Sequence, residues 1–484
     1  MMFLKAQGAC LFAMLSAVLA FGADAPLVEQ PPAASPIDNP AQQVAQVDTL
    51  IQQALEKQRI PGLSLAVVKD GQLILAKGYG LANVELHVPA TPETVYQMQS
   101  ITKSFTASGI MLLAEEGKLD LDDKVSQHLD GTPESWKVIT VRHLLTHTSG
   151  IKDFINEPTA SLRLDVSEED VLKATAARPL NFPPGEQHAY SNTNYHLLAM
   201  IIRKLTGQSY GDFLRERIFD PLGMTDTRVI SLSDIIPNRA AGYLLAKDGW
   251  RNGEFIAPSI LGYGGGGLRS TVPDMAKWDA ALDTERVLKR AALEQMWTPA
   301  KLNNGQTAVY GFGWGLRRIR GHRCVSHTGG HVTGFATVIS RFVDDRLTVI
   351  MFSNGRHAQV GRLAEQVAGV YVPSLAPPVY QPIEDKEPQV GVRLKEIYAS
   401  LAEGKPDDKS FTPEMMKVLA SQHEQLQQLA RTLGPLQSLV LVERADEGEL
   451  RLYRYRATYQ NGKNTVVLSL TKHEAISGLR LEPE

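Results

Sequence analysis

Hydrophobic and polar positions alternate with two different periods near the start of the chain. Residues 42–58 carry apolar side chains at helical spacing, which predicts an amphipathic helix. Two runs with strand character, LSLAVVK and QLILAKGY, then flank the dipeptide Asp70-Gly71. This dipeptide favours the tight turn of a β-hairpin, so an antiparallel sheet is expected to begin here.

Helical patterns fill much of 101–300, and strand patterns return only after that region. A further helix is expected at about 359–371. Three segments have strand character: GFGWGLRRI, ATVISRF and RLTVIMFSN. Strands at both ends of a helical region predict an α+β sandwich whose sheet is completed by the two ends of the domain. The predicted limits of this domain are 42–372.

A second domain is predicted beyond a proline-rich linker. Five prolines lie within residues 373–388, a composition typical of linkers. Helices are expected at 389–403 and 413–432, followed by four strands. The strand segments are LQSLVLVER, ELRLYRYRATY, NTVVLSL and AISGLRLE. Residues 389–484 therefore predict a small α+β accessory domain.

The first residues have the layout of a secretory signal peptide. Lys5 precedes the apolar run Ala9–Phe21 and a stretch of small residues, and the run is too short to span a bilayer. We therefore predict a signal peptide at 1–25 and a flexible leader at 26–41 that is rich in proline and small residues. This predicts a periplasmic or secreted protein.

Bulk composition excludes several classes of partner. The 484 residues carry a formal net charge of -3 with both signs spread along the chain, so no nucleic-acid partner is expected. No later apolar run reaches the roughly 20 residues of a membrane span, so no integral membrane segment is expected after signal cleavage. Of two cysteines, Cys10 lies in the predicted signal, which leaves Cys324 without an intrachain disulfide partner.

The segment YQMQSITKSFTASGIMLLAEEGKL contains the strongest candidate for chemistry. Ser100 and Lys103 are three residues apart at the start of a predicted buried helix, so both side chains lie on one face. A lysine can activate a serine if burial lowers its pKa from about 10.4 toward neutrality. The helix dipole would also favour an oxyanion near Ser100.

Ser-x-x-Lys is a weak signal alone, because it occurs again at Ser149-Lys152 and at Ser469-Lys472. Serine is also a common helix N-cap, so Ser100 in isolation is about as compatible with capping as with catalysis. The other two occurrences lie in a predicted loop and a predicted strand, where the lysine is not one helical turn away.

A second segment, AYSNTNYHLL, places Tyr190 and Asn192 at a turn that leads into a helix. A phenol beside an ammonium group can relay a proton between a nucleophile and a leaving group. Asn192 can hydrogen-bond the lysine and a substrate amide. The alternative is that Asn192 only caps the next helix.

A third segment, VSHTGGHVTGF, ends a strand in His327, Thr328, Gly329 and Gly330. Glycines there allow a substrate backbone to approach the strand edge, and the Gly330 N–H could complete an oxyanion hole with that of Ser100. His327 can supply a hydrogen bond, or a positive charge for a substrate carboxylate if it is protonated. The alternative is a tight hairpin with an exposed histidine.

Taken together, the three motifs resemble the serine β-lactamase and penicillin-binding protein superfamily in order and approximate spacing. The resemblance covers about 45–370 and is strongest to the branch of class C β-lactamases, D-alanyl-D-alanine carboxypeptidases, D-aminopeptidases and esterases. It implies a β-lactamase/transpeptidase-like fold and no metal or organic cofactor. It also implies roles: Ser100 is acylated, Lys103 is its base, Tyr190 relays the proton, and Asn192 and residues 327–330 bind a small-molecule or peptide substrate.

This sequence departs from the class C β-lactamase pattern where His327 replaces the lysine of Lys-Thr-Gly. The expected activity is therefore that of an exported hydrolase of D-amino-acid peptides or esters, with β-lactam hydrolysis as an alternative. A catalytically silent cell-wall or penicillin-binding sensor is another alternative. Residues 389–484 lie outside the family resemblance and look somewhat like an NTF2-type domain.

Three other interpretations carry less weight. His143 and His147 have a metal-ligand spacing, but HLLTH lacks the glutamate of His-Glu-x-x-His. Cys324 precedes His327 by three residues and could be a second nucleophile. A cysteine in a strand is more often a buried packing residue. The run Gly264–Gly267 lacks the Lys-Ser/Thr of a phosphate loop and is expected to let the chain pass close to the site. The oligomeric state is not predicted.

Overall fold

The computed structural model describes the chain from residue 39 onward in six stretches: 39–155, 163–261, 264–378, 380–404, 408–447 and 449–483. The predicted signal peptide 1–25 and almost all of the predicted leader 26–41 lie outside these residues. The chain divides into a larger unit that ends at Pro377 and a smaller unit that begins at Pro378. The residue limits of the predicted domains stay predictions.

The larger unit contains a seven-stranded antiparallel sheet in the order β3-β2-β1-β12-β11-β10-β9. Its strands are β1 (Gly62–Lys69), β2 (Gln72–Asn83), β3 (Val88–Pro89), β9 (Gly315–Ile319), β10 (His322–His331), β11 (Phe335–Phe342) and β12 (Leu347–Ser353). β1 pairs with β12, from Leu63 opposite Ser353 to Lys69 opposite Leu347. The two ends of the domain therefore complete one sheet, as the strand pattern predicted.

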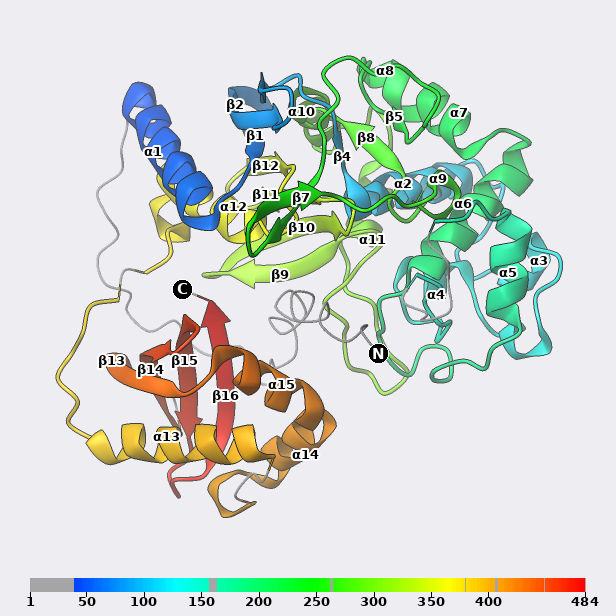
Figure 1. Ribbon diagram of the computed structural model, residues 1–484. Helices are drawn as coiled ribbons and strands as arrows, with labels where there is room; N and C mark the ends of the chain where they lie inside the picture. Colours follow the sequence, from blue (N-terminus) through cyan, green and yellow to red (C-terminus); the bar gives the residue numbers. More distant parts are fainter. Residues whose placement is uncertain are drawn as a thin grey trace. The chain divides into compact units, whose positions relative to one another are not determined.

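Helices cover both faces of this sheet, so every position of its central strands β11 and β12 is buried. On one face, α1 (Pro40–Gln58) and α12 (Val360–Tyr371) pack together (Figure 1) and share a core with Leu63, Leu65 and Val67. Side chains from the alternate positions of β1 enter the other core, which contains the helical region. Successive residues of a strand point to opposite faces, so one strand serves both cores.

The remaining elements of the larger unit are short and mostly helical. The helices are α2 (Thr102–Glu115), α3 (Val125–His128), α4 (Val141–Leu145), α5 (Glu168–Ala176), α6 (Asn192–Thr206), α7 (Tyr210–Leu214), α8 (Asp220–Leu222), α9 (Pro258–Leu261), α10 (Val272–Ala281) and α11 (Arg290–Met296). Short 3-10 or π turns are η3 (Gln99–Ile101), η4 (Glu134–Trp136), η5 (Arg215–Phe219) and η6 (Pro373–Leu375). Small sheets join β4 (Tyr96–Gln97), β8 (Leu268–Ser270) and β5 (Arg228–Val229), and also β6 (Tyr243–Ala246) and β7 (Gly249–Asn252).

α2 is the buried centre of the helical region. Every residue from Thr102 to Leu113 is buried, and the helix packs against α6, α7 and α11. A helix enclosed on all sides has no solvent-exposed face, which explains why its sequence shows almost no amphipathic stripe. Any polar side chain on it must find partners inside the protein.

The smaller unit is built from helices followed by a four-stranded antiparallel meander, in the order β13-β14-β15-β16. Its elements are α13 (Pro388–Glu403), η7 (Asp408–Ser410), α14 (Pro413–Ser421), α15 (His423–Leu433), β13 (Leu436–Glu447), β14 (Leu450–Tyr459), β15 (Gly462–Leu470) and β16 (Ile476–Pro483). The single helix expected at 413–432 is wrong. The backbone leaves the helical region at Gln422, so α14 packs on β16 while α15 packs on α13.

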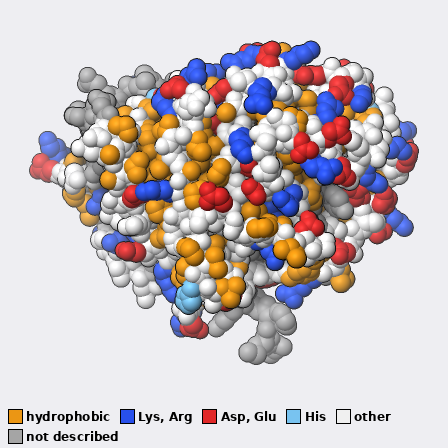
Figure 2. All heavy atoms as spheres, turned by 90° about the horizontal axis from the view of Figure 1, so that it is seen from above, with side chains coloured by type: hydrophobic (Ala, Val, Ile, Leu, Met, Phe, Trp, Pro, Cys, Tyr) orange, Lys and Arg blue, Asp and Glu red, His pale blue; other side chains and the backbone are white. Residues whose placement is uncertain are grey.

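Surface and proline-rich segments add two observations. On the face shown in Figure 2, basic and acidic side chains are interspersed rather than gathered by sign.

At the start of the predicted linker, Leu375 is fully buried in a 3-10 turn of the larger unit, so the chain remains packed beyond Pro373. None of the helices in the described stretches is both long and apolar enough to cross a bilayer.

Candidate active site

Ser100 and Lys103 meet at the start of α2. Ser100 lies in the 3-10 turn η3, one turn before the α-helix proper, and Lys103 lies in the first turn of α2. The Lys103 ammonium Nζ is 3.2 Å from the Ser100 hydroxyl Oγ. Gln99, immediately before the serine, has a φ of 54°, a left-handed conformation that is rare for a residue with a side chain. The nucleophile candidate thus sits on a tightly turned backbone.

The surroundings of Lys103 favour its neutral form. The residue is fully buried, and Nζ donates to the Asn192 Oδ1 at 2.9 Å and to the Gly265 carbonyl at 2.6 Å. Burial lowers the pKa of Lys103 to about 7, while the charge of Asp153 acts in the opposite direction. A lysine with this pKa can accept a proton near neutral pH.

Tyr190 and Asn192 come from the segment that enters α6. Lys103 Nζ stands 4.8 Å from the centre of the Tyr190 ring, and the Tyr190 phenol hydrogen-bonds to Ser100. Tyr190 exposes 40% of its surface, but its phenol is at the buried end, and burial raises the pKa of that group. Asn192 uses Oδ1 for Lys103 and donates from Nδ2 to Asp153 Oδ2 at 3.0 Å.

Strand β10 forms the opposite wall of the site. β11 pairs with His327, Thr328, Gly329 and Gly330 along one edge, whereas β9 pairs with β10 only as far as Ser326. The freed stretch of edge packs against η3, the turn that carries Ser100. The structure therefore brings all three predicted motifs together.

Glycines are required where this wall and its neighbours approach the nucleophile. A Cβ at Gly329 would lie 2.4 Å from the Met98 carbonyl oxygen, and one at Gly313, whose φ is 76°, would lie 2.5 Å from that of Lys103. Real Cβ atoms do not come so close to backbone, so only glycine fits at either position. A Cβ at Gly330 would lie 3.2 Å from the Arg356 guanidinium, so a cation stands beside this residue.

His327 is neutral. The Thr328 carbonyl can only accept, so the 2.7 Å contact with it places the proton on His327 Nδ1. His327 Nε2 then accepts from the Tyr310 hydroxyl at 2.9 Å. Burial lowers the pKa of His327 to about 3, and the nearby Lys103 acts in the same direction. Of the two roles predicted for this histidine, the hydrogen bond fits the structure, and the positive charge does not at neutral pH. The alternative of a tight hairpin with an exposed histidine does not fit the structure, since His327 is buried.

Several residues of the site carried no clear signal in the sequence. Asp153 and the Gly265 carbonyl hold Asn192 and Lys103 from distant loops. Tyr310 reaches His327 from the loop before β9. The run Gly264–Gly267 was expected to let the chain pass close to the site, and the contact between Lys103 and the Gly265 carbonyl confirms this.

The two histidines with metal-like spacing have structural partners instead. His143 Nδ1 accepts from the Thr140 amide, and His147 Nδ1 accepts from the Ser191 amide. The His147 ring lies 4.3 Å from the Tyr190 ring, so it supports the segment that enters α6. In the described stretches, no group of three or more His, Cys, Asp or Glu side chains is placed to hold a metal ion. Cys324 is buried in β10, and burial raises the pKa of its thiol, which disfavours the reactive thiolate.

Comparison with known proteins agrees with this geometry. Penicillin-binding protein 4* of Bacillus subtilis is 35% identical over 325 residues, which are 64% of this chain and 71% of that protein. The D-amino acid amidase of Ochrobactrum anthropi SV3 has 27% identity and a TM-score of 0.59, over 67% of this chain and 99% of the amidase.

A third likeness extends beyond the catalytic unit. The octameric penicillin-binding protein homologue of Pyrococcus abyssi covers 90% of this chain and 94% of its own, with a TM-score of 0.61 and 24% identity, so it supports the fold alone. The β-lactamase/transpeptidase-like fold that the family resemblance implied is confirmed by solved structures of this kind. A family model described as Beta-lactamase matches residues 47–371, the span that holds Ser100, Lys103, Tyr190 and the β10 wall. With these residues assembled within that span, the chain belongs to the beta-lactamase family of serine hydrolases.

Proposed function

We propose that the protein hydrolyses an amide or ester through an acyl-enzyme at Ser100. The observation that carries the proposal is a fully buried lysine, with a pKa lowered to about 7, whose Nζ lies 3.2 Å from the Ser100 hydroxyl. Neutral Lys103 takes the proton of Ser100 as Oγ attacks the substrate carbonyl carbon. The resulting oxyanion is held by the N–H groups of Ser100 and Gly330.

Collapse of this tetrahedral intermediate needs a proton on the leaving group. Tyr190 is the donor, because its phenol contacts Ser100 and its ring lies beside Lys103. The phenol gives its proton to the leaving group and takes back from Lys103 the proton that came from Ser100. Loss of the leaving amine or alcohol leaves Ser100 esterified. A water molecule, activated by the same groups, then releases the acid and restores the serine.

The proposed substrates are peptides, amides or esters of D-amino acids, cleaved in the manner of a DD-peptidase or esterase. This choice is supported by the likeness to a D-amino acid amidase and to a penicillin-binding protein. The neutral His327 stands at the position of the family's lysine and offers no positive charge there to a β-lactam carboxylate, which disfavours rapid turnover of β-lactams. Residues 1–25, as a signal peptide, would deliver the enzyme to the periplasm or the medium.

The first experiment is intact-mass spectrometry of the purified protein after incubation with a penicillin and, separately, a fluorophosphonate. An adduct that maps to Ser100 and is absent from Ser100→Ala is expected. Hydrolysis of D-phenylalanine p-nitroanilide and its L enantiomer then tests the substrate class, with the D form expected to be faster. A Ser100 adduct without turnover of any amide, ester or penicillin would instead favour the silent sensor.

A further inference from the structure

A cavity of about 290 Å³ opens in the larger unit, close to the turn that carries Ser100. Its polar lining includes Arg239, Arg269 and Gln97, and its apolar lining includes Ile230 and Phe255. Ser100 and Lys103 do not line it. The cavity therefore has its own chemistry, in which two cations stand among apolar side chains.

Arg269 is the more unusual of the two cations because it is only 5% exposed. It lies in the central strand of the small sheet, directly opposite Gln97 on β4 and Arg228 on β5, so all three side chains share one face. Its Nε has no hydrogen-bond partner among the described residues. Like charges directly opposite in a sheet repel, so the guanidinium groups of Arg269 and Arg228 are expected to turn apart.

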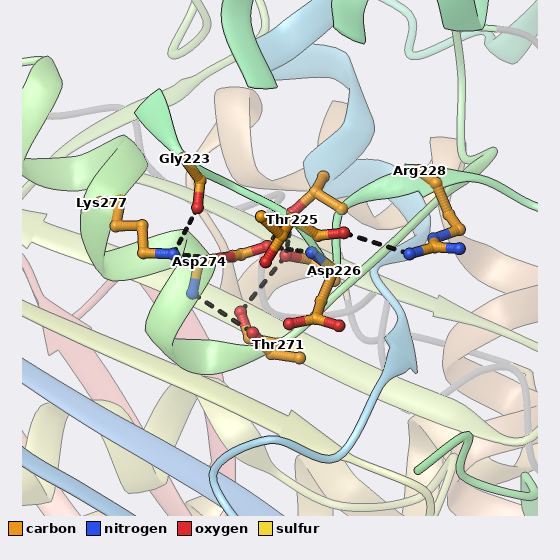
Figure 3. A network of polar contacts seen from close by, with 9 residues as sticks. Gly223, Thr225, Asp226, Arg228, Thr271, Asp274 and Lys277 are labelled. Carbon is orange, nitrogen blue, oxygen red and sulfur yellow. Dashed lines mark hydrogen bonds and ion pairs between the residues drawn. The ribbon is translucent and has the colours of Figure 1, made fainter. Parts of the chain in front are cut away.

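Arg228 is already held elsewhere. Its guanidinium turns to the Thr225 carbonyl at 3.1 Å (Figure 3). The same segment is fixed to α10, where Asp274 accepts from the Asp226 amide at 2.9 Å and from Lys277 at 2.8 Å (Figure 3). Arg228 is therefore not one of the residues that line the cavity.

Arg239 and Arg269 are left without a counter-ion. Within the described stretches, no carboxylate forms an ion pair with either residue. One acid, Glu254, also lines the cavity, and its ion pair is with Arg163 at 3.9 Å. Burial lowers the pKa of Arg269 to about 10, and the charge of Arg239 adds to the effect. This is still high enough to leave Arg269 cationic at neutral pH.

The cavity is joined to the nucleophile by one glutamine. The Gln99 side chain donates from Nε2 to Thr333 Oγ1 at 2.9 Å and to Gln97 Oε1 at 2.8 Å. Both of these partners line the cavity, and Gln99 is the residue before Ser100. The cavity is thus next to the turn that carries the serine.

The positions of the proton donor and the oxyanion groups decide which part of the substrate faces this cavity. Tyr190 lies near His327, with 6.3 Å between ring centres, so the leaving group that it protonates lies at that end of β10. The acyl part must then extend the other way, past Gly330 and His331 toward Thr333 and the cavity.

We propose that this cavity binds a carboxylate carried by the acyl part of the substrate, with Arg239 and Arg269 as its partners and the apolar wall against the chain that carries it. The inference rests on the proposed acyl-enzyme function. It defines the substrate class further, as amides or esters whose acyl portion ends in an acid.

The test compares mono-p-nitrophenyl esters of adipic, pimelic and suberic acid with the methyl ester of each. In the unaltered protein, kcat/KM for at least one acid should exceed that of its methyl ester by about tenfold or more. Arg239→Ala, at an exposed position that tolerates change, should reduce this ratio about tenfold, and Arg239→Glu should bring it below one. Arg269→Met should act similarly, and Arg290→Ala, an exposed arginine on α11, should leave the ratio unchanged.

A second measurement separates the two proposals. Monomethyl suberate is titrated calorimetrically into Ser100→Ala, with and without Arg239→Ala. Arginine-dependent binding together with no hydrolysis of any ester would overturn the catalytic proposal and leave the cavity as an anion site. Hydrolysis with acid-to-methyl ratios that stay near one in all variants would overturn the cavity proposal, and so would anion binding that does not depend on Arg239.

Discussion

The larger unit contains the sequence Ser-x-x-Lys twice, and the two copies have different surroundings. At Ser100 the lysine is buried and its amine faces the hydroxyl. At Ser149 the serine is the buried partner, its hydroxyl donates to Asn194 Oδ1 at 2.7 Å, and Lys152 is partly exposed. The same four-residue pattern thus places a buried amine against a hydroxyl in one place and anchors a loop in the other. What separates them is which side chain is desolvated and whether the hydroxyl is already engaged.

The largest expected effect comes from removing each hydroxyl in turn. Ser100→Ala should lower kcat by at least about 10⁴-fold, because the proposed acyl-enzyme forms on this hydroxyl. Ser149→Ala should leave kcat of the folded protein near normal but cost about 1 kcal/mol of unfolding free energy through the lost bond to Asn194. Steady-state kinetics and urea unfolding measure both. Equal kinetic losses in the two variants would remove the distinction.

Exchanging each lysine for methionine gives the next effect. Lys103→Met keeps the buried volume but removes the base, so kcat should fall by about 10²- to 10⁴-fold. Lys152→Met removes an amine that is not in contact with Ser149, and activity should change little. Near-normal turnover by Lys103→Met would mean that another group deprotonates Ser100.

The pH dependence tests the charge state of Lys103. The base works only without its proton, so kcat/KM should rise with pH and level off above about 7, where Lys103 is neutral. Below that value the rate should fall about tenfold for each pH unit. A pH–rate profile that is flat between pH 5 and 8 would contradict the assignment of this lysine as the base.

The smallest effect should come from Asp153. Its negative charge raises the pKa of Lys103, so Asp153→Asn should move the acidic limb of the profile to lower pH by a fraction of a unit. The isosteric change retains an oxygen to accept from Asn192. A limb that stays in place or moves to higher pH would show that Asp153 is not charged beside the lysine.

The sequence predicted the sheet and the catalytic motifs because both leave local patterns. The hairpin at Asp70 and the apolar runs of β11 and β12 can be recognised within ten residues. The break at Gln422 could not, because it depends on α14 and α15 packing against different partners. Asp153, Tyr310 and the Gly265 carbonyl were missed for a related reason: each reaches the site from a loop distant in the chain.

Charge and burial of single groups were also beyond the sequence. His327 could be read as neutral or cationic until its two ring nitrogens were seen to be bonded to Thr328 and Tyr310. The two arginines that line the cavity, Arg239 and Arg269, lie in different segments of the chain. Only the fold brings them to one hollow.

The close approach of Gly313 and Gly329 to backbone carbonyls has a consequence for how this enzyme can diversify. No side chain fits at either position, so these two glycines next to the nucleophile candidate cannot be substituted without displacing the backbone. The rim of the cavity differs, since Leu232 and Phe255 are 59% and 50% exposed. Natural or laboratory variants should therefore acquire new substrates through substitutions at the rim, at Leu232 and Phe255, while Gly313 and Gly329 are retained.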